Sequence, residues 1–480
     1  MNGRLKHFGL ISIGAIAGIL ISLGITAVAQ REARLPLPLE ELRQFSDVFG
    51  AIKANYVEPV EDKKLITEAI SGMLSGLDPH SAYLDADAFK ELQVGTQGEF
   101  GGLGIEVGVE DGFVKVVSPI EDTPAARAGV KAGDLIVKID EKPTKGMPLG
   151  DAVKLMRGKP KSQVTLTISR KGENRPVVIP IIRDVIRVQS VKSKMIEPGY
   201  GYLRVTQFQE HTVENLVKHI DGLYRQGGLQ GLVLDLRNDP GGLLHGAVGV
   251  SAAFLQPKVV VTSTDGRTED AKRKYLASPE DYLRGSRDDI LDKLPAAVKT
   301  VPMVVLVNGG SASASEIVAG ALQDYKRAAV IGTQTFGKGS VQSILPLTNN
   351  TAIKLTTARY YTPNGRSIQA KGITPDFLVE ETPEGDLNQF RLREADLTRH
   401  LSNPKGAEEK PNVPTPSAVE AANEKLKDRK PIEFGSADDY QLQQAMNHLK
   451  GKPVMIAKAK DETPKPEVQN GKANGSAKGK

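Results

Sequence analysis

The chain has 480 residues, of which 39% are hydrophobic and 25% are charged. This composition is ordinary for a globular protein, and the length suffices for about three domains. The chain contains no Cys, which excludes a disulfide scaffold, a Cys-ligated zinc site, an iron–sulfur cluster and a thiol nucleophile. A net charge of +5 is too small to indicate a nucleic-acid-binding protein.

The N-terminal segment predicts export. Residues 8–30 carry no charged side chain, and about 20 apolar helical residues span a bilayer. The two basic residues that precede the segment predict a cytoplasmic N-terminus, and Ala27-Val28-Ala29 fits a signal-peptidase site. We therefore expect residues 1–30 to be either a cleaved signal peptide or an uncleaved membrane anchor. Both alternatives place the remaining chain in the periplasm, either soluble or anchored to the inner membrane.

Residues 36–93 carry two apolar stripes with the 3.6-residue period of an amphipathic helix. The first stripe consists of Leu39, Leu42, Phe45, Val48, Phe49 and Ile52, and the second of Leu65, Ile66, Ala69, Ile70, Met73 and Leu74. Such stripes need an apolar partner. We expect a helical N-terminal arm that packs either against the rest of the chain or against a second copy in a dimer.

Residues 95–183 alternate short strands with turns. The dipeptide Asp111-Gly112 is typical of a hairpin between two strands. A short helix, a strand, a second helix and another strand follow. This order, together with the run AARAGVKAGDLIVKIDEKP, resembles a PDZ domain of the bacterial, circularly permuted type.

A Gly-rich loop marks the candidate peptide site of this domain. Gly101, Gly102, Leu103 and Gly104 can present consecutive backbone amides to the C-terminal carboxylate of a peptide. The alternative is that these glycines only form a tight turn. The adjoining strand edge and the helix near PLGDAVKLM would hold the extended peptide and its last apolar side chain.

Residues 184–395 predict an α/β domain with parallel strands. Two strand-like runs, LVLDLR and MVVLVN, each lead through a Gly-rich turn into a helix. Ligands of such folds bind at the carboxyl ends of the strands, so the two turns are the places where chemistry is expected.

The remaining chain is expected to contribute little to the fold. Residues 396–450 contain one short helical pattern, DDYQLQQAMNHLKG. Residues 451–480 hold 7 Lys and 3 acidic residues and too few apolar side chains to offset the entropy of ordering. We expect a disordered tail that carries about +4 of the net charge, leaving the folded part nearly neutral.

Ser313 is the candidate nucleophile. It lies in the turn GGSASASE, between a predicted buried strand and a predicted helix. The backbone amides that open a helix can stabilise an oxyanion, aided by the helix dipole. The alternative is a serine that only caps the helix, which is a common arrangement.

Lys338 is the candidate base for that serine. It follows Ser313 by 25 residues, in the Gly-rich and otherwise apolar stretch FGKGSVQ. Burial lowers the pKa of a lysine, so its neutral amine can act as a base, and Ser–Lys pairs are a known variant of nucleophile and base. Gln342 can hydrogen-bond the amine and orient it. The alternative is a solvated surface lysine.

The combination of these motifs resembles the carboxy-terminal processing proteases, also called tail-specific proteases, over residues 36–395. Besides the signal segment and the PDZ domain, the resemblance rests on LDPHSAYLD, LDLRNDPGG, NGGSASASEI, GTQTFGKGSVQ and RYYTPNGRSIQAKGITPD. It implies a crotonase/ClpP-like ββα protease core in residues 184–395, with the PDZ domain inserted and with helical arms at the N- and C-terminal ends.

The resemblance also implies roles for individual residues. Ser313 is the nucleophile, Lys338 the general base and Gln342 the residue that orients the lysine. The oxyanion hole maps onto the amide of Ala314 and a glycine of LRNDPGG. Gly241 is the better choice, since the preceding proline has no N–H, and Gly242 is the reserve.

The expected function is a serine endopeptidase that cleaves proteins near their C-termini and recognises apolar tails through the PDZ domain. No cofactor, metal or nucleic acid is expected. The expected partners are substrate proteins with exposed apolar C-termini, an adaptor or activator protein, and further copies of the chain in a homodimer or higher oligomer. The alternative function is a non-catalytic periplasmic scaffold that binds peptides through the PDZ domain.

Overall fold

The computed structural model describes residues 37–120, 122–173, 175–285, 288–383, 392–404 and 433–456. The expected signal or anchor segment, residues 1–30, lies outside these ranges, as do residues 457–480 of the expected tail, residues 451–480. The chain divides into two compact units, Met1–Ser71 and Gly72–Lys480. None of the helices within the described ranges combines the length and the apolar character needed to cross a bilayer.

The described part of the first unit is helical. Helix α2 spans Leu39–Asn55, and α3 spans Asp62–Ser75, with its last turn in the second unit. These bounds confirm the two predicted amphipathic helices. No residue of α2 is buried, so its apolar stripe is uncovered in the described part of this unit.

The second unit is built on a six-stranded sheet. Its order is β10-β11-β12-β15-β16-β19, and all neighbours are parallel except the antiparallel pair β10 and β11. The strands span Val191–Glu197, Tyr200–Val205, Gly231–Asp235, Met303–Val307, Ala329–Gly332 and Phe377–Leu378 in that order. Every residue of β12 and β15 is buried, as expected for central parallel strands covered on both faces.

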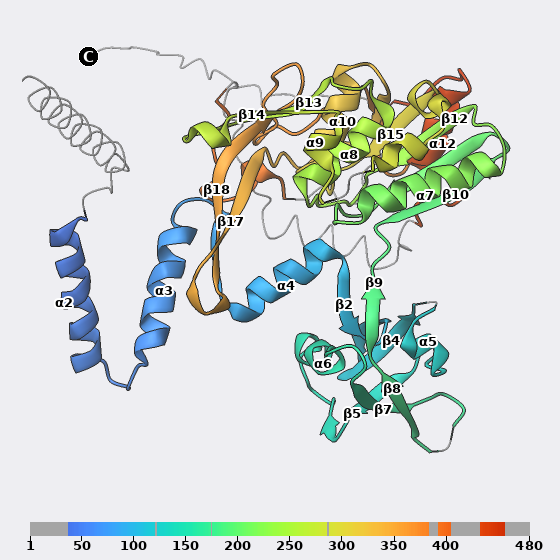
Figure 1. The fold of residues 1–480 in the computed structure, drawn as a ribbon. Helices are drawn as coiled ribbons and strands as arrows, with labels where there is room; N and C mark the ends of the chain where they lie inside the picture. Colours follow the sequence, from blue (N-terminus) through green and yellow to red (C-terminus); the bar gives the residue numbers. More distant parts are fainter. Residues whose placement is uncertain are drawn as a thin grey trace, which may run out of the picture. The chain divides into compact units, whose positions relative to one another are not determined.

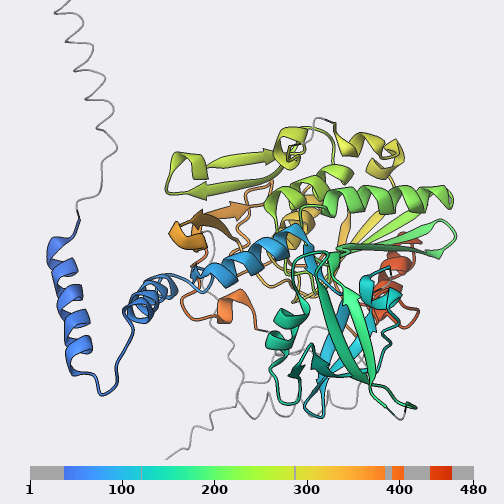
Figure 2. The same cartoon turned by 60° about the horizontal axis from the view of Figure 1, so that its bottom comes forward.

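Helices cover both faces of this sheet (Figure 2). Alternate strand residues such as Leu232 and Leu234 pack with α7 (Thr212–Arg225), α8 (Leu244–Phe254) and α10 (Ala314–Asp324). The intervening residues, such as Val233, pack with α12 (Tyr440–Leu449). The predicted C-terminal helix thus completes the core, although residues 405–432 before it lie outside the described ranges.

A second, five-stranded sheet lies in the same unit. Its strands are β1 (Ala82–Leu84), β13 (Val260–Gly266), β14 (Arg273–Leu276), β17 (Ser340–Pro346) and β18 (Ala352–Tyr361). The long ribbon of β17 and β18 is evident in Figure 1. Strand β1 falls within residues 36–93, which were expected to be helical, because Ala82–Leu84 pairs with the edge of β18.

Short helical elements complete the second unit. They are α4 (Ala86–Gln97), α9 (Pro279–Tyr282) and the 3₁₀ helices η1 (Glu269–Ala271), η2 (Ile290–Lys293), η3 (Ala296–Lys299), η4 (Thr348–Asn350) and η5 (Glu394–Asp396). Asp85 caps α4 by accepting the amide proton of Ala88.

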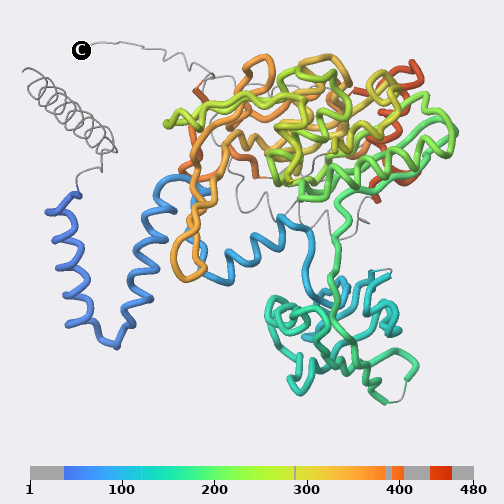
Figure 3. Tube along the Cα trace, viewed as in Figure 1, coloured from blue at the N-terminus to red at the C-terminus, as the bar shows by residue number. Residues whose placement is uncertain are grey.

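The PDZ-like module is inserted between β2 (Glu99–Gly102) and β9 (Asp184–Arg187), which pair with each other. Figure 3 shows the chain entering through β2 and leaving through β9. The module contains β3 (Ile105–Glu110), β4 (Phe113–Pro119), α5 (Pro124–Arg127), β5 (Leu135–Ile139), β6 (Lys142–Pro143), α6 (Leu149–Met156), β7 (Gln163–Ser169) and β8 (Val177–Ile182). Asp111 and Gly112 have φ of 52° and 77°, which confirms the predicted tight hairpin turn.

Candidate active site

The two Gly-rich turns meet at one edge of the six-stranded sheet, where the neighbouring parallel strands β12 and β15 end. The amide of Ala312 donates to the carbonyl oxygen of Asp239 at 3.0 Å. The Ser311 hydroxyl donates to the Leu236 carbonyl oxygen at 2.8 Å. These bonds hold the loop that follows β12 against the turn that follows β15.

Only one of the three clustered serines is accessible to solvent. The hydroxyls of Ser311 and Ser315 are fully buried, and both donate to backbone carbonyls of the β12 loop, that of Ser315 to Asp239 at 2.9 Å. Ser313 is partly exposed. The structure therefore leaves Ser313 as the serine that a substrate can reach.

Ser313 has an unusual backbone conformation. It occupies the N-cap position of α10 with φ 54° and ψ −110°, a region that residues other than Gly rarely adopt. Such strain costs about 1–3 kcal/mol and persists only where the surroundings impose it. The N-cap alternative is thus met by position, yet the strained turn also presents this side chain at the sheet edge.

Glu316 connects the turn that contains Ser313 to the loop that contains Lys338. This carboxylate is fully buried and accepts the amide protons of Ser313 at 2.8 Å, Gly337 at 2.7 Å and Lys338 at 3.0 Å. It also accepts the Thr335 hydroxyl at 2.5 Å. Burial raises the pKa of Glu316 to about 7, against the effect of these four donors.

The sequence analysis did not identify Glu316. A signal was present, because a Glu three residues after a Ser at a helix start is the capping-box pattern. That pattern identifies the bond to Ser313, but it does not show that the same carboxylate reaches Lys338.

Lys338 lies between β16 and β17, and its amide shares the Glu316 carboxylate with the amide of Ser313. Its Nζ donates to Gln342 Oε1 and to the Ser340 carbonyl oxygen, the latter at 3.2 Å. Within the described ranges, no hydrogen bond joins Nζ to Ser313 Oγ. Gln342 also donates from Nε2 to Ser340 Oγ at 3.0 Å and to Thr356 Oγ1 at 3.1 Å, so its amide orientation is defined on both sides.

The environment of Lys338 shifts its titration toward the neutral amine. Burial lowers its pKa from 10.5 to about 8, and the nearby charge of Lys354 acts in the same direction. Three carboxylates oppose the shift: Glu394, Glu316 and Asp78. The solvated-lysine alternative does not describe this environment.

Tyr360 on β18 is a second residue that the sequence analysis missed. Its buried hydroxyl donates to the Lys338 carbonyl oxygen. The Ser313 side chain hydrogen-bonds the same hydroxyl, which lowers the pKa of Tyr360, although burial raises that pKa more strongly. In this conformation Ser313 therefore contacts Tyr360, and Lys338 contacts Gln342.

The predicted oxyanion donors lie beside Ser313. A Cβ on Gly241 would lie 2.8 Å from the Ala314 amide nitrogen and 2.9 Å from Ser313 Cβ. The Ala314 amide has no hydrogen-bond partner among the described residues, whereas the Gly241 amide donates to Asp239 Oδ1 at 2.8 Å. Gly242 would place a Cβ 2.1 Å from the Phe208 carbonyl oxygen. Of the two main predicted oxyanion donors, the Gly241 amide is thus hydrogen-bonded within its own loop, and the Ala314 amide is not.

The predicted carboxylate-binding residues of the PDZ-like module divide between two elements. Gly101 and Gly102 lie in β2, where they face Val185 and Asp184 of β9. Leu103 and Gly104 form the turn into β3, and Gly104 has φ 78°. Only the last two therefore form a loop.

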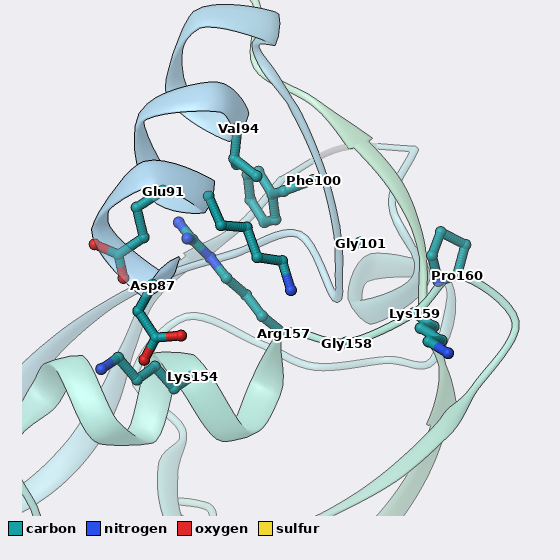
Figure 4. Close-up of a pocket in the computed structure, with 11 residues that line it drawn as sticks. Asp87, Glu91, Val94, Phe100, Gly101, Lys154, Arg157, Gly158, Lys159 and Pro160 are labelled. Atoms are coloured by element: carbon teal, nitrogen blue, oxygen red, sulfur yellow. The ribbon is translucent and has the colours of Figure 1, made fainter. Parts of the chain in front are cut away.

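The module also contains a group of half-buried apolar residues of β3 and α6: Ile105, Val107, Leu149 and Val153. A pocket of about 570 Å³ is lined by residues of α4, of β2, of α6 and of the loop that follows α6 (Figure 4). There the Arg157 guanidinium stacks on the Phe100 ring, 4.7 Å from its centroid. The described residues contain no cluster of three His, Asp or Glu side chains that could hold a metal ion.

Comparison with known protein families agrees with this arrangement. Residues 199–379 match the model of peptidase family S41, residues 115–170 match a PDZ domain, and residues 22–88 match the N-terminal domain of the activating protease CtpB. Three separate parts of the chain thus match models named for a peptidase, a PDZ domain and an activating protease.

Individual relatives span nearly the whole chain. The carboxy-terminal-processing protease of Bartonella bacilliformis is 44% identical over 443 residues, 91% of this chain and 95% of that protein. The carboxy-terminal processing protease CtpA of Bacillus subtilis is 35% identical over 385 residues, 79% of this chain and 78% of that protein. A solved photosystem II D1 C-terminal processing protease is 30% identical, covering 68% of this chain and 88% of that one, with a TM-score of 0.40. The chain therefore belongs to peptidase family S41 and, within it, to the carboxy-terminal processing proteases, peptidases that act near the C-termini of proteins.

Proposed function

We propose that this chain is a serine endopeptidase in which Ser313 is the nucleophile, Lys338 the general base and Gln342 the residue that orients the base. One observation carries the proposal. The buried carboxylate of Glu316 binds the backbone amides of both Ser313 and Lys338, so one side chain sets the distance between nucleophile and base. A serine and a lysine with unrelated structural tasks would not need such a link.

The hydrogen bonds of Lys338 suit a base. A neutral amine has two N–H groups and one lone pair. Gln342 Oε1 and the Ser340 carbonyl oxygen accept two N–H bonds, which leaves the lone pair free for the Ser313 proton. Because the pKa of Lys338 is lowered to about 8, a substantial fraction of the amine is neutral near pH 8.

The proposed reaction is acyl transfer in two steps. The Lys338 amine removes the proton from Ser313 Oγ while this oxygen attacks the substrate carbonyl carbon, and the Ala314 amide stabilises the oxyanion. The Lys338 ammonium then gives its proton to the leaving amide nitrogen as the peptide bond breaks. A water molecule then attacks the acyl carbon while the Lys338 amine takes its proton, and the Lys338 ammonium returns that proton to Ser313 Oγ as the acyl group leaves.

The described conformation requires a rearrangement before this reaction. Ser313 contacts Tyr360 rather than Lys338. The Gly241 amide donates to Asp239 and is therefore not available, together with the Ala314 amide, for an oxyanion. We propose that substrate or an activating partner brings Ser313 to Lys338 and releases the Gly241 amide for the oxyanion.

We propose that the substrates are proteins with exposed apolar C-termini. The turn of Leu103 and Gly104 would bind the terminal carboxylate, and the apolar edge of β3 and α6 would bind the last side chain. The half-buried residues Ile105 and Val153 support this assignment.

Location and assembly belong to the same proposal. The uncharged segment over residues 8–30 supports an exported, periplasmic protein, either soluble or held at the inner membrane. The exposed apolar stripe of α2 supports packing against a second copy or an adaptor. Cell fractionation of the full chain and of a chain lacking residues 1–30 tests the location, and light scattering of α2 stripe variants tests the assembly.

The catalytic proposal is tested with matched active-site variants. Wild type, Ser313→Ala and Lys338→Ala are incubated with a labelled unfolded protein and with two peptides that differ only in an apolar or a charged C-terminus. We expect wild type to cleave the apolar-tailed peptide faster, and each variant to lose at least about 1,000-fold in kcat while retaining its melting temperature. A Ser313→Ala protein that cleaves like wild type would refute the proposal.

The alternative, a scaffold without catalysis, predicts a different outcome. Wild type and Ser313→Ala would bind the apolar-tailed peptide equally, and neither would cleave it, with or without an extract of the cell envelope as a source of activating partners.

A further inference from the structure

The turn that follows α3 contains a buried carboxylate that faces the catalytic region. Asp78 is 4% exposed and accepts the amide protons of His80 and Ser81 at 2.8 and 3.0 Å. It also accepts the hydroxyls of Ser81 at 2.7 Å and Thr356 at 3.0 Å. The first three bonds shape the turn itself, whereas the fourth connects it to β18 of the protease core.

The Thr356 hydroxyl connects Asp78 to Gln342. A hydroxyl has one proton to donate. Because a carboxylate can only accept, the bond to Asp78 uses that proton, and the Thr356 oxygen is then available as an acceptor. Gln342 Nε2 donates to it at 3.1 Å. The Asp78 carboxylate, at one end of this series of hydrogen bonds, thus determines which atom donates and which accepts in each of the following bonds.

This direction determines which atom Gln342 presents to Lys338. With Nε2 directed at Thr356, Oε1 faces the Lys338 amine and accepts its N–H. The Ser340 hydroxyl, which also contacts Gln342 Nε2 at 3.0 Å, can donate or accept and therefore does not select an orientation. Thr356, held by Asp78, does select one.

We propose that Asp78 and Thr356 are positioning residues for the Lys338 base: their hydrogen bonds hold the Gln342 amide with its oxygen toward the lysine. The inference rests on the proposed function. With the amide reversed, its N–H group would donate to the lone pair of the neutral amine, and the amine could no longer accept the Ser313 proton.

A second contact holds the turn against the same strand. The Thr356 amide donates to Ser81 Oγ at 3.1 Å, and Ser81 Oγ donates to Asp78. Both the backbone and the side chain of Thr356 are therefore bound to the turn, and this double attachment explains how a segment 278 residues distant in sequence can hold one hydroxyl in place.

Asp78 also acts on Lys338 through its charge, and the two effects need separate tests. The charged groups around Lys338 are Lys354, Glu394, Glu316 and Asp78. Of these, Glu394 is itself paired with His80 at 2.7 Å. We call the hydrogen bonds from Asp78 through Thr356 to Gln342 the relay. Removing the Asp78 charge changes both the relay and the electrostatics of Lys338, whereas removing the Thr356 hydroxyl changes the relay alone.

The decisive experiment compares Thr356→Val, Thr356→Ser and the control Thr357→Val. Thr357 shares a hydroxyl–hydroxyl bond of 2.7 Å with Ser343 across the same two strands, and among the described residues no hydrogen bond joins it to Gln342. We expect Thr356→Val to lower kcat by about 10- to 100-fold, part of the 100- to 10,000-fold that a general base supplies, with little change in KM. Thr356→Ser should restore kcat to within about 3-fold of wild type, because the hydroxyl is retained.

The control and the rescue decide the interpretation. Peptide cleavage and melting temperature are measured for all variants and for Ser313→Ala. Wild-type kcat in Thr356→Val, an equal loss in Thr356→Ser, or an equal loss in Thr357→Val would each overturn the relay. Cleavage by Ser313→Ala would instead overturn the proposed function on which the relay depends.

Asp78→Asn provides the second readout. The substitution keeps the shape of the side chain but removes its negative charge. Because that charge raises the pKa of Lys338, its removal lowers this pKa. We expect kcat to fall and the acid limb of its pH profile to move to lower pH, whereas Thr356→Val lowers the plateau with a smaller shift of that limb. An Asp78→Asn protein with the wild-type plateau and the wild-type limb would contradict the proposal.

Discussion

Replacing Glu316 by Gln separates alignment of the active site from stability of the fold. The carboxylate presents one oxygen to the amides of Ser313 and Lys338 and the other to Thr335 and Gly337. Gln keeps the size of the side chain but replaces one of these oxygens by an amide N–H₂ group. Whichever orientation the new amide takes, at least one backbone N–H faces another donor.

The free-energy cost can be worked from these bonds. If the nitrogen faces Ser313 and Lys338, two backbone donors lose their acceptor; in the other orientation Gly337 loses it, whereas the Thr335 hydroxyl can turn and accept. Each buried donor left without a partner costs about 1–3 kcal/mol. Against this, a pKa of Glu316 raised from 4.5 to about 7 corresponds to about 3 kcal/mol of lost stability when the group is ionised.

These contributions nearly cancel above pH 7, so we expect the unfolding free energy of Glu316→Gln to stay within about 3 kcal/mol of wild type at pH 8. Its kcat should fall by about 100-fold, because a displacement of about 1 Å between reacting groups has that effect. Since the pKa of Glu316 is raised on folding, its stabilising contribution is complete below about pH 4.5 and is lost as the pH rises through about 7.

The assay follows kcat for a peptide substrate and the denaturant unfolding free energy between pH 4.5 and 8. Wild type should lose about 3 kcal/mol more than Glu316→Gln over that range. The control is Asp281→Asn, which alters a buried carboxylate that accepts the Leu276 amide at 2.6 Å, away from Ser313. A Glu316→Gln enzyme with wild-type kcat would refute the view that this carboxylate aligns nucleophile and base.

Three further predictions follow from the site and its support. The kcat of wild type should rise as the pH increases through about 8, where Lys338 loses its proton, and a profile flat from pH 6 to 9 would contradict a lysine base. Gly241→Ala should lower kcat by about 100-fold, because φ is 98° and the new Cβ would lie 2.8 Å from the Ala314 amide nitrogen, whereas Gly222→Ala, in open space on α7, should leave kcat unchanged. Arg237→Met should lower the unfolding free energy by about 3–5 kcal/mol in denaturant titration, because it leaves the buried Asp439 carboxylate without its cation and the buried Asp235 carboxylate with Arg204 alone; a change below about 1 kcal/mol would contradict this role.

The local elements of the fold were predictable because short patterns encode them. The 3.6-residue period located the two arm helices, the strand-like runs before Gly-rich turns located β12 and β15, and one short helical pattern located α12. The Asp111-Gly112 hairpin was predicted from its dipeptide, since both residues readily adopt positive φ. Strand β1 was missed because three residues carry no period, and their partner strand lies about 270 residues away.

The site was predictable only as far as its residues lie in recognisable turns. Ser313 and Lys338 were predicted because the neighbouring sequence suggests a chemical role for each: a serine at the start of a helix and a lysine among glycines. The links between them could not be predicted, because Glu316 reaches Lys338 across 22 residues and Asp78 reaches Thr356 across 278. Such contacts depend on the register of strands and loops, which the local sequence does not specify.

If Ser313 and Lys338 are the catalytic pair, two exchanges of hydrogen bonds separate the described conformation from the reactive one. The Ser313 hydroxyl must pass from Tyr360 to Lys338, and the Gly241 amide must pass from Asp239 to the oxyanion. Ser313 exchanges one hydrogen-bond partner for another, whereas the buried Gly241 amide loses its acceptor until an oxyanion forms, which costs about 1–3 kcal/mol. The reactive conformation is therefore populated at about 0.6–16%. A peptide that forms two or three main-chain bonds only in the reactive conformation supplies free energy of that size. Peptide binding alone would then activate the enzyme, and a partner protein would need to contribute no more than the same few kcal/mol.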